Sequence, residues 1–408
     1  MKTYHFKKII LFSILLGLSQ VSWAACTQTL SPGVNLASAV SSASAGSTIC
    51  LNSGNYGISS FTNIVKTSDV TVQSVSGNTA SLSLNINGSN HLRFQNLTIS
   101  ELEIAGGATK NITISNSTFT GQAVLQMDGN YNANILIDSS TFDGISVCSN
   151  CYEGRLEVIG GTAIGGSYQP AGVTISNNHF GNAGESDGIQ LSAYGVIVGP
   201  GNVFDGIIQG NYGRHVDAIQ GYGQSHTTIT GNYFINNSIQ IMMPDGGDTE
   251  IITNNVFIAS SSNNGIQLGT HSNDSFIHNT VKNITVNMDK KVENSTSSQN
   301  NVARNNIMIN SDFKTVDSAG NAACNNCTFD NNLFNSSGNA KGTNNIIGTP
   351  TFVGGTSPTT QSGYQLTSSS LGYRAATDGN DMGSLIAGTT APPAPTTSPA
   401  APTNLQVN

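Results

Sequence analysis

VTISNNHF (173–180), TITGNYF (228–234) and IITNNVF (251–257) are three copies of one short phrase, an apolar strand that ends in Asn before a large apolar residue. Further copies are VIVGPGNVF (196–204), SFIHNTV (275–281), ARNNI (303–307) and FDNNLF (329–334). Aligned on one Asn per phrase, the repeat has intervals of 23 to 30 residues and runs through Asn178, Asn202, Asn232, Asn255, Asn279, Asn305 and Asn332. A repeat of this length that carries strands rather than helices is typical of a β-solenoid.

The repeat also predicts how the coils stack. A single coil cannot bury its apolar face, whereas stacked coils cover one another and pair their strands in parallel. We expect the recurrent Asn to form an internal amide ladder at one bend, with the apolar residue two positions later pointing inward. Weaker copies at 97–100, 111–119 and 135–142 extend the series to about ten coils. At the strand spacing these would form a rod of roughly 50 Å.

The two ends of this region carry a family resemblance. NLASAVSSASAGSTICLNSGNY (35–56) is similar to the capping helix and first strand of the pectate lyase-like superfamily, and ATDGNDMGSL (376–385) resembles a closing segment of such proteins. Residues 25–388 as a whole resemble that superfamily, but no motif selects one family within it. The resemblance implies an all-β, right-handed parallel β-helix with a short N-terminal capping helix. It also implies activity on a polysaccharide, often by β-elimination.

The two termini differ in composition from the repeats. Residues 1–24 combine Lys2, Lys7 and Lys8 with the apolar run 9–18 and Ser22-Trp23-Ala24, which predicts a signal peptide. The apolar run is short for a membrane span, so we expect a secreted, periplasmic or cell-surface protein with no transmembrane segment. Residues 389–408 are rich in Pro, Ala and Thr and are interpreted as a linker and tail.

The charge of the chain limits the classes of binding partner, and its cysteines indicate the compartment. Only 9% of residues are charged and the net charge is −8, which argues against nucleic acid. Anionic polysaccharide stays possible as a partner where a basic cluster or a cation reverses the local field. The six cysteines fall into three local pairs, which we interpret as disulfides of a monomeric exported protein. These pairs are Cys26 with Cys50, Cys148 with Cys151, and Cys324 with Cys327.

A second pattern places a Gln after an aliphatic residue on successive coils. If Ile189, Ile219, Ile239 and Ile266 point inward, the following side chains point outward. The predicted stripe of substrate-binding amides is Gln190, Gln220, Gln240 and Gln267, joined by Gln126. A solvent-facing amide ladder without a ligand is an equally good interpretation of this stripe.

Two aspartates precede this stripe at equivalent positions. Asp187 and Asp217 each lie three residues before a Gln, so we expect them on adjacent coils about 5 Å apart, within the range of strong repulsion. A Ca²⁺ ion, a nearby Arg or a raised pKa would relieve the repulsion. Arg214 and His215 are the other predicted catalytic residues, and Tyr222, His226 and His271 are predicted substrate contacts. The competing interpretation is that the two aspartates bond to the backbone at a bend.

Three functions are consistent with these patterns and with what the resemblance implies. The preferred hypothesis is an exported lyase or C5-epimerase acting on a uronic-acid polymer. In that case Arg214, with a cation on Asp187 and Asp217, neutralises the sugar carboxylate, and His215 or Tyr222 takes part in removing the C5 proton. The second hypothesis is a non-catalytic glycan-binding or adhesive rod. The third is a glycoside hydrolase that uses the paired acids.

Overall fold

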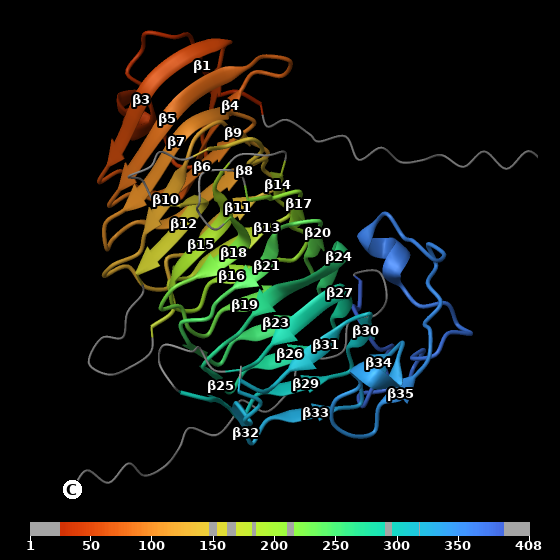
Figure 1. Cartoon of the computed structure of the whole chain (residues 1–408). Helices are drawn as coiled ribbons and strands as arrows, with labels where there is room; N and C mark the ends of the chain where they lie inside the picture. The colour runs from red at the N-terminus through yellow and green to blue at the C-terminus, as the bar shows by residue number, and fades with distance from the viewer. Residues whose placement is uncertain are drawn as a thin grey trace, which may run out of the picture.

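The fold is a parallel β-helix of about 11 turns in which 49% of residues lie in strands. The computed structural model describes residues 25–146, 153–160, 169–181, 185–209, 216–289, 296–317 and 319–386. The coils stack from the N-terminal end at the top of Figure 1 to the C-terminal end at the bottom. The predicted fold class is therefore confirmed.

The longest continuous face is a sheet of 13 parallel strands. Its strands, in spatial order, are β1 (Gln28–Leu30), β2 (Thr48–Leu51), β4 (Val65–Ser74), β6 (Asn90–Gln95), β8 (Lys110–Ser115), β11 (Ile135–Asp138), β13 (Val173–Ser176), β16 (Ile197–Val198), β19 (Thr228–Thr230), β23 (Ile251–Thr253), β26 (Ser275–Ile277), β29 (Val302–Arg304) and β33 (Thr328–Asp330). Each pairs with the equivalent strand of the next coil, so spatial order follows chain order.

A second, 18-stranded sheet forms the remaining faces because its long strands bend from one face into the next. It contains β3 (Gly54–Thr62), β5 (Ala80–Asn87), β7 (Thr98–Ala105), β9 (Thr118–Phe119), β10 (Ala123–Gln126), β12 (Gly154–Gly160), β14 (His179–Gly181), β15 (Asp187–Ala193), β17 (Val203–Asp205), β18 (Asp217–Gly221), β20 (Tyr233–Ile235), β21 (Ile239–Met242), β24 (Val256–Gln267), β27 (Thr280–Asn287), β30 (Ile307–Ile309), β31 (Asp312–Lys314), β34 (Leu333–Phe334) and β35 (Ile346–Ile347). A small third sheet comprises β22 (Gly247–Asp248), β25 (His271–Ser272), β28 (Ser298–Gln299) and β32 (Cys324–Asn325).

The N-terminal coil carries the expected short helix. Helix α1 (Leu36–Ser42) starts at the N-cap Asn35, whose side chain accepts a hydrogen bond from the backbone N–H of Ser38 at 2.9 Å. Leu36 and Val40 are buried in the core beside the first strands. Two 3₁₀ turns, η1 (Ser337–Asn339) and η2 (Gln361–Tyr364), lie near the other end.

The Asn ladder is present and continuous. Each ladder side chain accepts a hydrogen bond from the backbone N–H of the equivalent residue one coil earlier; Asn255 Oδ1, for example, lies 2.9 Å from the N–H of Asn232. The ladder members are Asn178, Asn202, Asn232, Asn255, Asn279, Asn306 and Asn332, and the hydroxyls of Ser117 and Ser140 continue it upstream. The predicted member Asn305 is wrong by one residue. Asn305 instead has φ +58°, a left-handed conformation that Asn tolerates better than most residues.

A stack of phenylalanine rings lies two residues after the ladder, as predicted. Phe119, Phe142, Phe180, Phe204, Phe234 and Phe257 follow one another with ring centroids 4.1 to 5.0 Å apart. All six are fully or almost fully buried. The ladder and this stack together fix the register of the coils, since a slip of one residue would expose the rings and bury polar side chains.

The C-terminal segment 349–386 runs back along the outside of the coils. Gln361 donates to the carbonyl of Gly231 at 3.1 Å, and Ser384 donates to that of Asn254 at 2.6 Å. Its aromatic side chains Phe352 and Tyr364 form a second core cluster with outward-facing residues of the coils. In Figure 1 this blue segment lies beside β24, β27 and β30.

Two of the three predicted disulfides are confirmed. Cys26 is bonded to Cys50, and Cys324 to Cys327. The predicted pair Cys148 and Cys151 lies outside the described residues, as do the predicted signal peptide and the predicted tail. Disulfides are expected in an oxidising compartment. Of the helices that the structure describes, none has the length and apolar character needed to cross a membrane.

Candidate functional site

Asp187 and Asp217 lie on adjacent coils, as the sequence predicted. They begin β15 and β18, whose register pairs Ile189 with Ile219. Both aspartates are completely buried, and the backbone N–H of Asp217 donates to Asp187 Oδ1 at 2.7 Å. The backbone-bonding alternative therefore holds for one oxygen of Asp187.

The remaining carboxyl oxygens of this pair are unusual. Within the described chain, Asp187 Oδ2 and both oxygens of Asp217 are buried without a hydrogen-bond partner. Burial, with the neighbouring charge of Asp217, raises the pKa of Asp187 to about 9. Burial, with the charge of Glu153, raises the pKa of Asp217 to about 7. Environments that push two neighbouring pKa values apart are typical of an acid–base pair.

A backbone bend brings these carboxyl groups to the start of their strands. Asp187, Gly188 and Ile189 are all buried, so strict in–out alternation is broken there. A Cβ on Gly188 would lie 2.5 Å from the carbonyl oxygen of Ala218, closer than real Cβ contacts allow. Glycine is therefore required for the two coils to approach each other at this point.

A third carboxyl group, missed by the sequence analysis, lies on the preceding coil. Glu157 in β12 is 1% exposed and pairs in register with Gln190. Burial raises the pKa of Glu157 to about 7, against the opposing effect of a 2.8 Å hydrogen bond from the N–H of Gly154. With its amide nitrogen turned toward Glu157, Gln190 donates to the carboxylate, 3.3 Å from Oε2. Three buried carboxyl groups thus occupy three successive coils.

A buried arginine supports this cluster. Arg155 is fully buried in β12 and donates to the carbonyl oxygens of Phe142 and Gly181, each at 2.8 Å. Burial lowers its pKa to about 10, against the opposing charges of Asp143 and Asp187, so the guanidinium stays charged at neutral pH. The sequence analysis did not single out Arg155, because a lone Arg in an apolar strand carries no motif.

The predicted Gln stripe is only partly formed. The outward positions in register across five coils are Glu157, Gln190, Gln220, Met242 and Gln267, which we call the outer row. The prediction for Gln240 is wrong, because the register pairs Ile241 rather than Ile239 with Ile219. Gln240 is instead fully buried, and its Oε1 accepts from the side chain of Asn237 at 2.8 Å. Gln126 pairs with Ile159 and lies outside the outer row.

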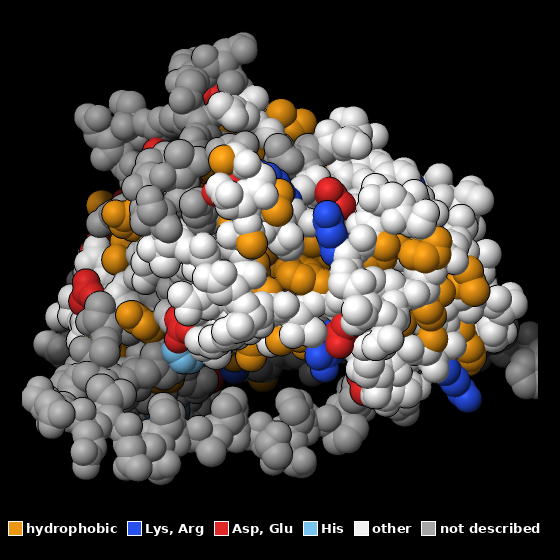
Figure 2. All heavy atoms as spheres, turned by 60° about the horizontal axis from the view of Figure 1, so that its bottom comes forward, with side chains coloured by type: hydrophobic (Ala, Val, Ile, Leu, Met, Phe, Trp, Pro, Cys, Tyr) orange, Lys and Arg blue, Asp and Glu red, His pale blue; other side chains and the backbone are white. Residues whose placement is uncertain are grey.

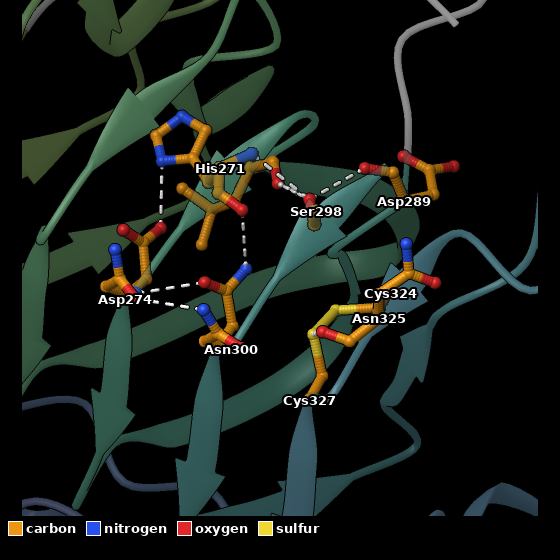
Figure 3. The surroundings of a disulfide bond; sticks show 11 residues. His271, Asp274, Asp289, Ser298, Asn300, Cys324, Asn325 and Cys327 are labelled. Carbon is orange, nitrogen blue, oxygen red and sulfur yellow. Dashed lines mark hydrogen bonds and ion pairs between the residues drawn. A yellow bond between two sulfur atoms is a disulfide. The ribbon is translucent and has the colours of Figure 1, made fainter. Parts of the chain in front are cut away.

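His271, predicted to contact substrate, is completely buried. Its Nδ1 lies 2.8 Å from Asp274 Oδ2, and its Nε2 lies 2.8 Å from the carbonyl oxygen of Met243. Figure 3 shows the ring turned toward Asp274, on the small sheet that also carries the Cys324–Cys327 disulfide. The prediction that His271 lies at the surface is therefore wrong, because its ring is enclosed in the core.

Of the other predicted contacts, Tyr222 is 65% exposed just beyond the end of β18. His226 is partly exposed at the next bend, where its Nδ1 lies 2.7 Å from Ser225 Oγ. Arg214 and His215 lie outside the described residues. A polar hollow of about 190 Å³ adjoins the coil after Asp217, lined in part by Asn236, Ser238 and Ser260.

The described residues contain no group of three His, Cys, Asp or Glu side chains arranged to hold a metal ion. The unpaired oxygens of Asp187 and Asp217 are nevertheless hard donors of the kind that Ca²⁺ takes. Figure 2 shows that charged side chains are sparse on one face of the molecule, where most of the surface is white.

Comparison with solved structures identifies the fold. The alginate lyase AlyGC is 15% identical with a TM-score of 0.50, over 84% of this chain and 56% of AlyGC. A mannuronic acid-specific family 6 lyase from human gut microbiota is 15% identical (TM-score 0.45, 79% and 82%), and pectate lyase Pel9A is 16% identical (TM-score 0.44, 89% and 97%). No family model and no curated protein matches the sequence. The likeness to AlyGC is one of fold, so the protein belongs to the parallel β-helix class, with no family within that class identified.

Proposed function

We propose that the protein is an exported enzyme acting on a uronic-acid-containing polysaccharide, as a lyase or C5-epimerase. The observation that carries this proposal is the set of buried carboxyl groups Glu157, Asp187 and Asp217 on three successive coils, with their raised pKa values. Burial of three carboxyl groups costs stability, above all at Asp187 and Asp217, whose oxygens include unpaired ones. Such a cost is typical of a functional site.

The chemistry follows from the separated pKa values. Removal of the C5 proton of a uronate requires a base and a partner that neutralises the sugar carboxylate. Asp217, ionised above about pH 7, acts as the base through one bridging water, because its carboxyl oxygens are enclosed. Asp187, protonated below about pH 9, donates from Oδ2 toward the sugar carboxylate by the same route, as a neutral acid can in an apolar site. A lyase then expels the oxygen at C4, which takes up the proton that Asp217 removed from C5, whereas an epimerase returns a proton from water to the opposite face of C5.

A bound Ca²⁺ ion is a second way to relieve the repulsion between the carboxylates of Asp187 and Asp217. Asp187 Oδ2 and both oxygens of Asp217 would be its protein ligands, and the ion would supply positive charge toward a uronate carboxylate. A chelator should abolish activity if calcium relieves the repulsion and should leave activity unchanged if protonation of Asp187 does. An assay with and without chelator therefore separates the two.

The surroundings fit a long, hydroxyl-rich substrate. The outer row presents amides at Gln190, Gln220 and Gln267, and the polar hollow beside Ser238 and Ser260 adds hydroxyl and amide groups. An extended polymer lying along the coils, which are spaced about 4.8 Å apart, would meet amides on three of the five coils of this row. The names of the similar structures, alginate and pectate lyases, guide the choice of substrates.

The test is a substrate panel of alginate, pectate and glycosaminoglycans, with Ca²⁺ or with chelator. Ultraviolet absorbance detects the unsaturated ends made by a lyase, and NMR detects inversion at C5. We expect Asp217→Asn to lose activity while retaining the circular dichroism of the wild type. Gln267→Ala, on the outer row but distant from the acids, is the matched control and should change KM more than kcat. Binding without any product across the panel would favour the non-catalytic rod.

A glycoside hydrolase is the second candidate, because two adjacent carboxyl groups with separated pKa values also define an acid and a nucleophile or base. New reducing ends that lack ultraviolet absorbance would identify it. The same Asp217→Asn variant would be inactive in either case, so the product rather than the variant decides between them.

A further inference from the structure

A second hollow lies far from the acids, between the C-terminal segment and the flank of the coils. It has a volume of about 260 Å³, and its walls include Ile309, Pro350, Phe352, Pro358 and Tyr364. Its lining is mostly apolar, unlike the polar hollow near Asp217. The proposed reaction uses none of these residues.

One lysine interrupts the otherwise aliphatic wall of this hollow. The strand register aligns Ile235, Ile258, Lys282 and Ile309 on four successive coils, and the three isoleucines pack against the second core cluster, which the C-terminal segment forms with the coils. Lys282 lines the hollow and is only partly exposed. Among the described residues, no carboxylate lies within ion-pair distance of its ammonium, in contrast to Lys314, which pairs with Asp289 at 2.9 Å.

An ammonium at an apolar wall is costly unless an anion or water meets it. An isoleucine at this position would complete the aliphatic row, so Lys282 makes less favourable apolar contact with the wall than the residue type found on the neighbouring coils. Tyr364, 3% exposed, is an aromatic wall of the same hollow. The hollow therefore offers apolar walls with one charged hydrogen-bond donor, the ammonium of Lys282.

We propose that this hollow is a binding site for a small organic carboxylate with an apolar body, whose carboxylate pairs with Lys282 and whose body contacts Ile309, Phe352 and the two prolines. The apolar walls exclude strongly hydrated anions, since such anions would lose water without regaining hydrogen bonds there. The site is independent of the proposed polysaccharide chemistry.

The test is isothermal titration of the full mature protein with benzoate and hexanoate, with benzamide as the neutral counterpart of benzoate. We expect saturable, one-to-one binding of at least one carboxylate, and about tenfold weaker binding of benzamide, the difference expected for one charged hydrogen bond. Lys282→Met should weaken carboxylate binding about tenfold and leave benzamide unchanged. Lys110→Met, which removes an exposed charge on a distant coil, is the matched control and should change neither.

A second variant keeps the proposal testable without changing charge. Thr356 is exposed at the rim of the hollow, so Thr356→Phe should fill the space without disturbing the core and should abolish binding. Three results would overturn the proposal: no saturable binding of either carboxylate, equal affinity for benzoate and benzamide, or unchanged binding in Thr356→Phe. Loss of polysaccharide activity is neither expected nor required, so failure here leaves the proposed function untouched.

Discussion

The Asn ladder should dominate the stability of the central coils, and Asn255→Ala tests this directly. Asn255 is fully buried, and its side chain makes four hydrogen bonds. Its Oδ1 accepts from the N–H and Nδ2 of Asn232 at 2.9 and 3.0 Å, and its Nδ2 donates to Ile229 O at 2.8 Å and Asn279 Oδ1 at 3.1 Å. At about 1 kcal/mol per bond, the loss is about 4 kcal/mol, before any added cost of leaving buried partners unpaired.

The assay is urea unfolding followed by circular dichroism, together with hydrogen exchange of the flanking strands, because a solenoid can unfold coil by coil. Asn335→Ala is the matched control. Asn335 also exchanges two hydrogen bonds with Asn310, at 2.8 and 2.9 Å, but on the exposed surface, where the expected cost is below about 1 kcal/mol. Equal losses in the two variants, or protection from exchange that is unchanged beside Asn255, would refute the reasoning.

Three further predictions concern acids and a disulfide. Catalysis should rise as Asp217 ionises near pH 7 and fall as Asp187 loses its proton near pH 9; Asp187→Asn should remove the alkaline limb, and a profile unchanged in that variant would exclude Asp187. Burial raises the pKa of Glu250 to about 8, above its unfolded value, so its stabilising contribution is complete in acid and is lost as pH rises from about 4 to about 8. Glu250→Gln cannot ionise, so its free energy of unfolding should exceed that of the wild type by about 4 kcal/mol at pH 8 and approach it at pH 4; parallel stability curves in chemical denaturation would contradict this. Cys50→Ser opens a disulfide between residues 24 positions apart, which should cost roughly 3 kcal/mol and expose the N-terminal coil first to proteolysis, and reductant should have no further effect on that coil.

The fold could be predicted from sequence because its two stabilising columns use few residue types. Asn at the ladder and Phe two residues later recur in most central coils, and both columns formed where expected. The single error, Asn305 for Asn306, arose in a phrase with two adjacent asparagines. There the left-handed bend takes the first Asn and the ladder takes the second, a distinction that depends on φ and not on composition.

The site was predicted less completely because it lies where the strand pattern is broken. Asp187 and Asp217 were found from their equal spacing to Gln190 and Gln220. Gln240 was misplaced because the strand register pairs Ile219 with Ile241, two residues after the Ile239 that the sequence pattern had aligned with it. Glu157 and Arg155 were missed because their coil carries no Asp-Gly or Ile-Gln phrase, so only the strand register brings them beside the aspartates.

The ladder also separates two properties that most folds link, the length of a coil and its position in the stack. Consecutive ladder bonds join residues 38, 24, 30 and 23 positions apart, yet the bonded atoms meet with similar geometry each time. Extra residues are therefore absorbed between the fixed points, and the two longest spans enter the coils that begin with Gly154 and Asp217. Insertions or deletions there could remodel whatever surrounds the acids while leaving the scaffold in register, so divergent relatives of this chain should differ in specificity long before they differ in shape.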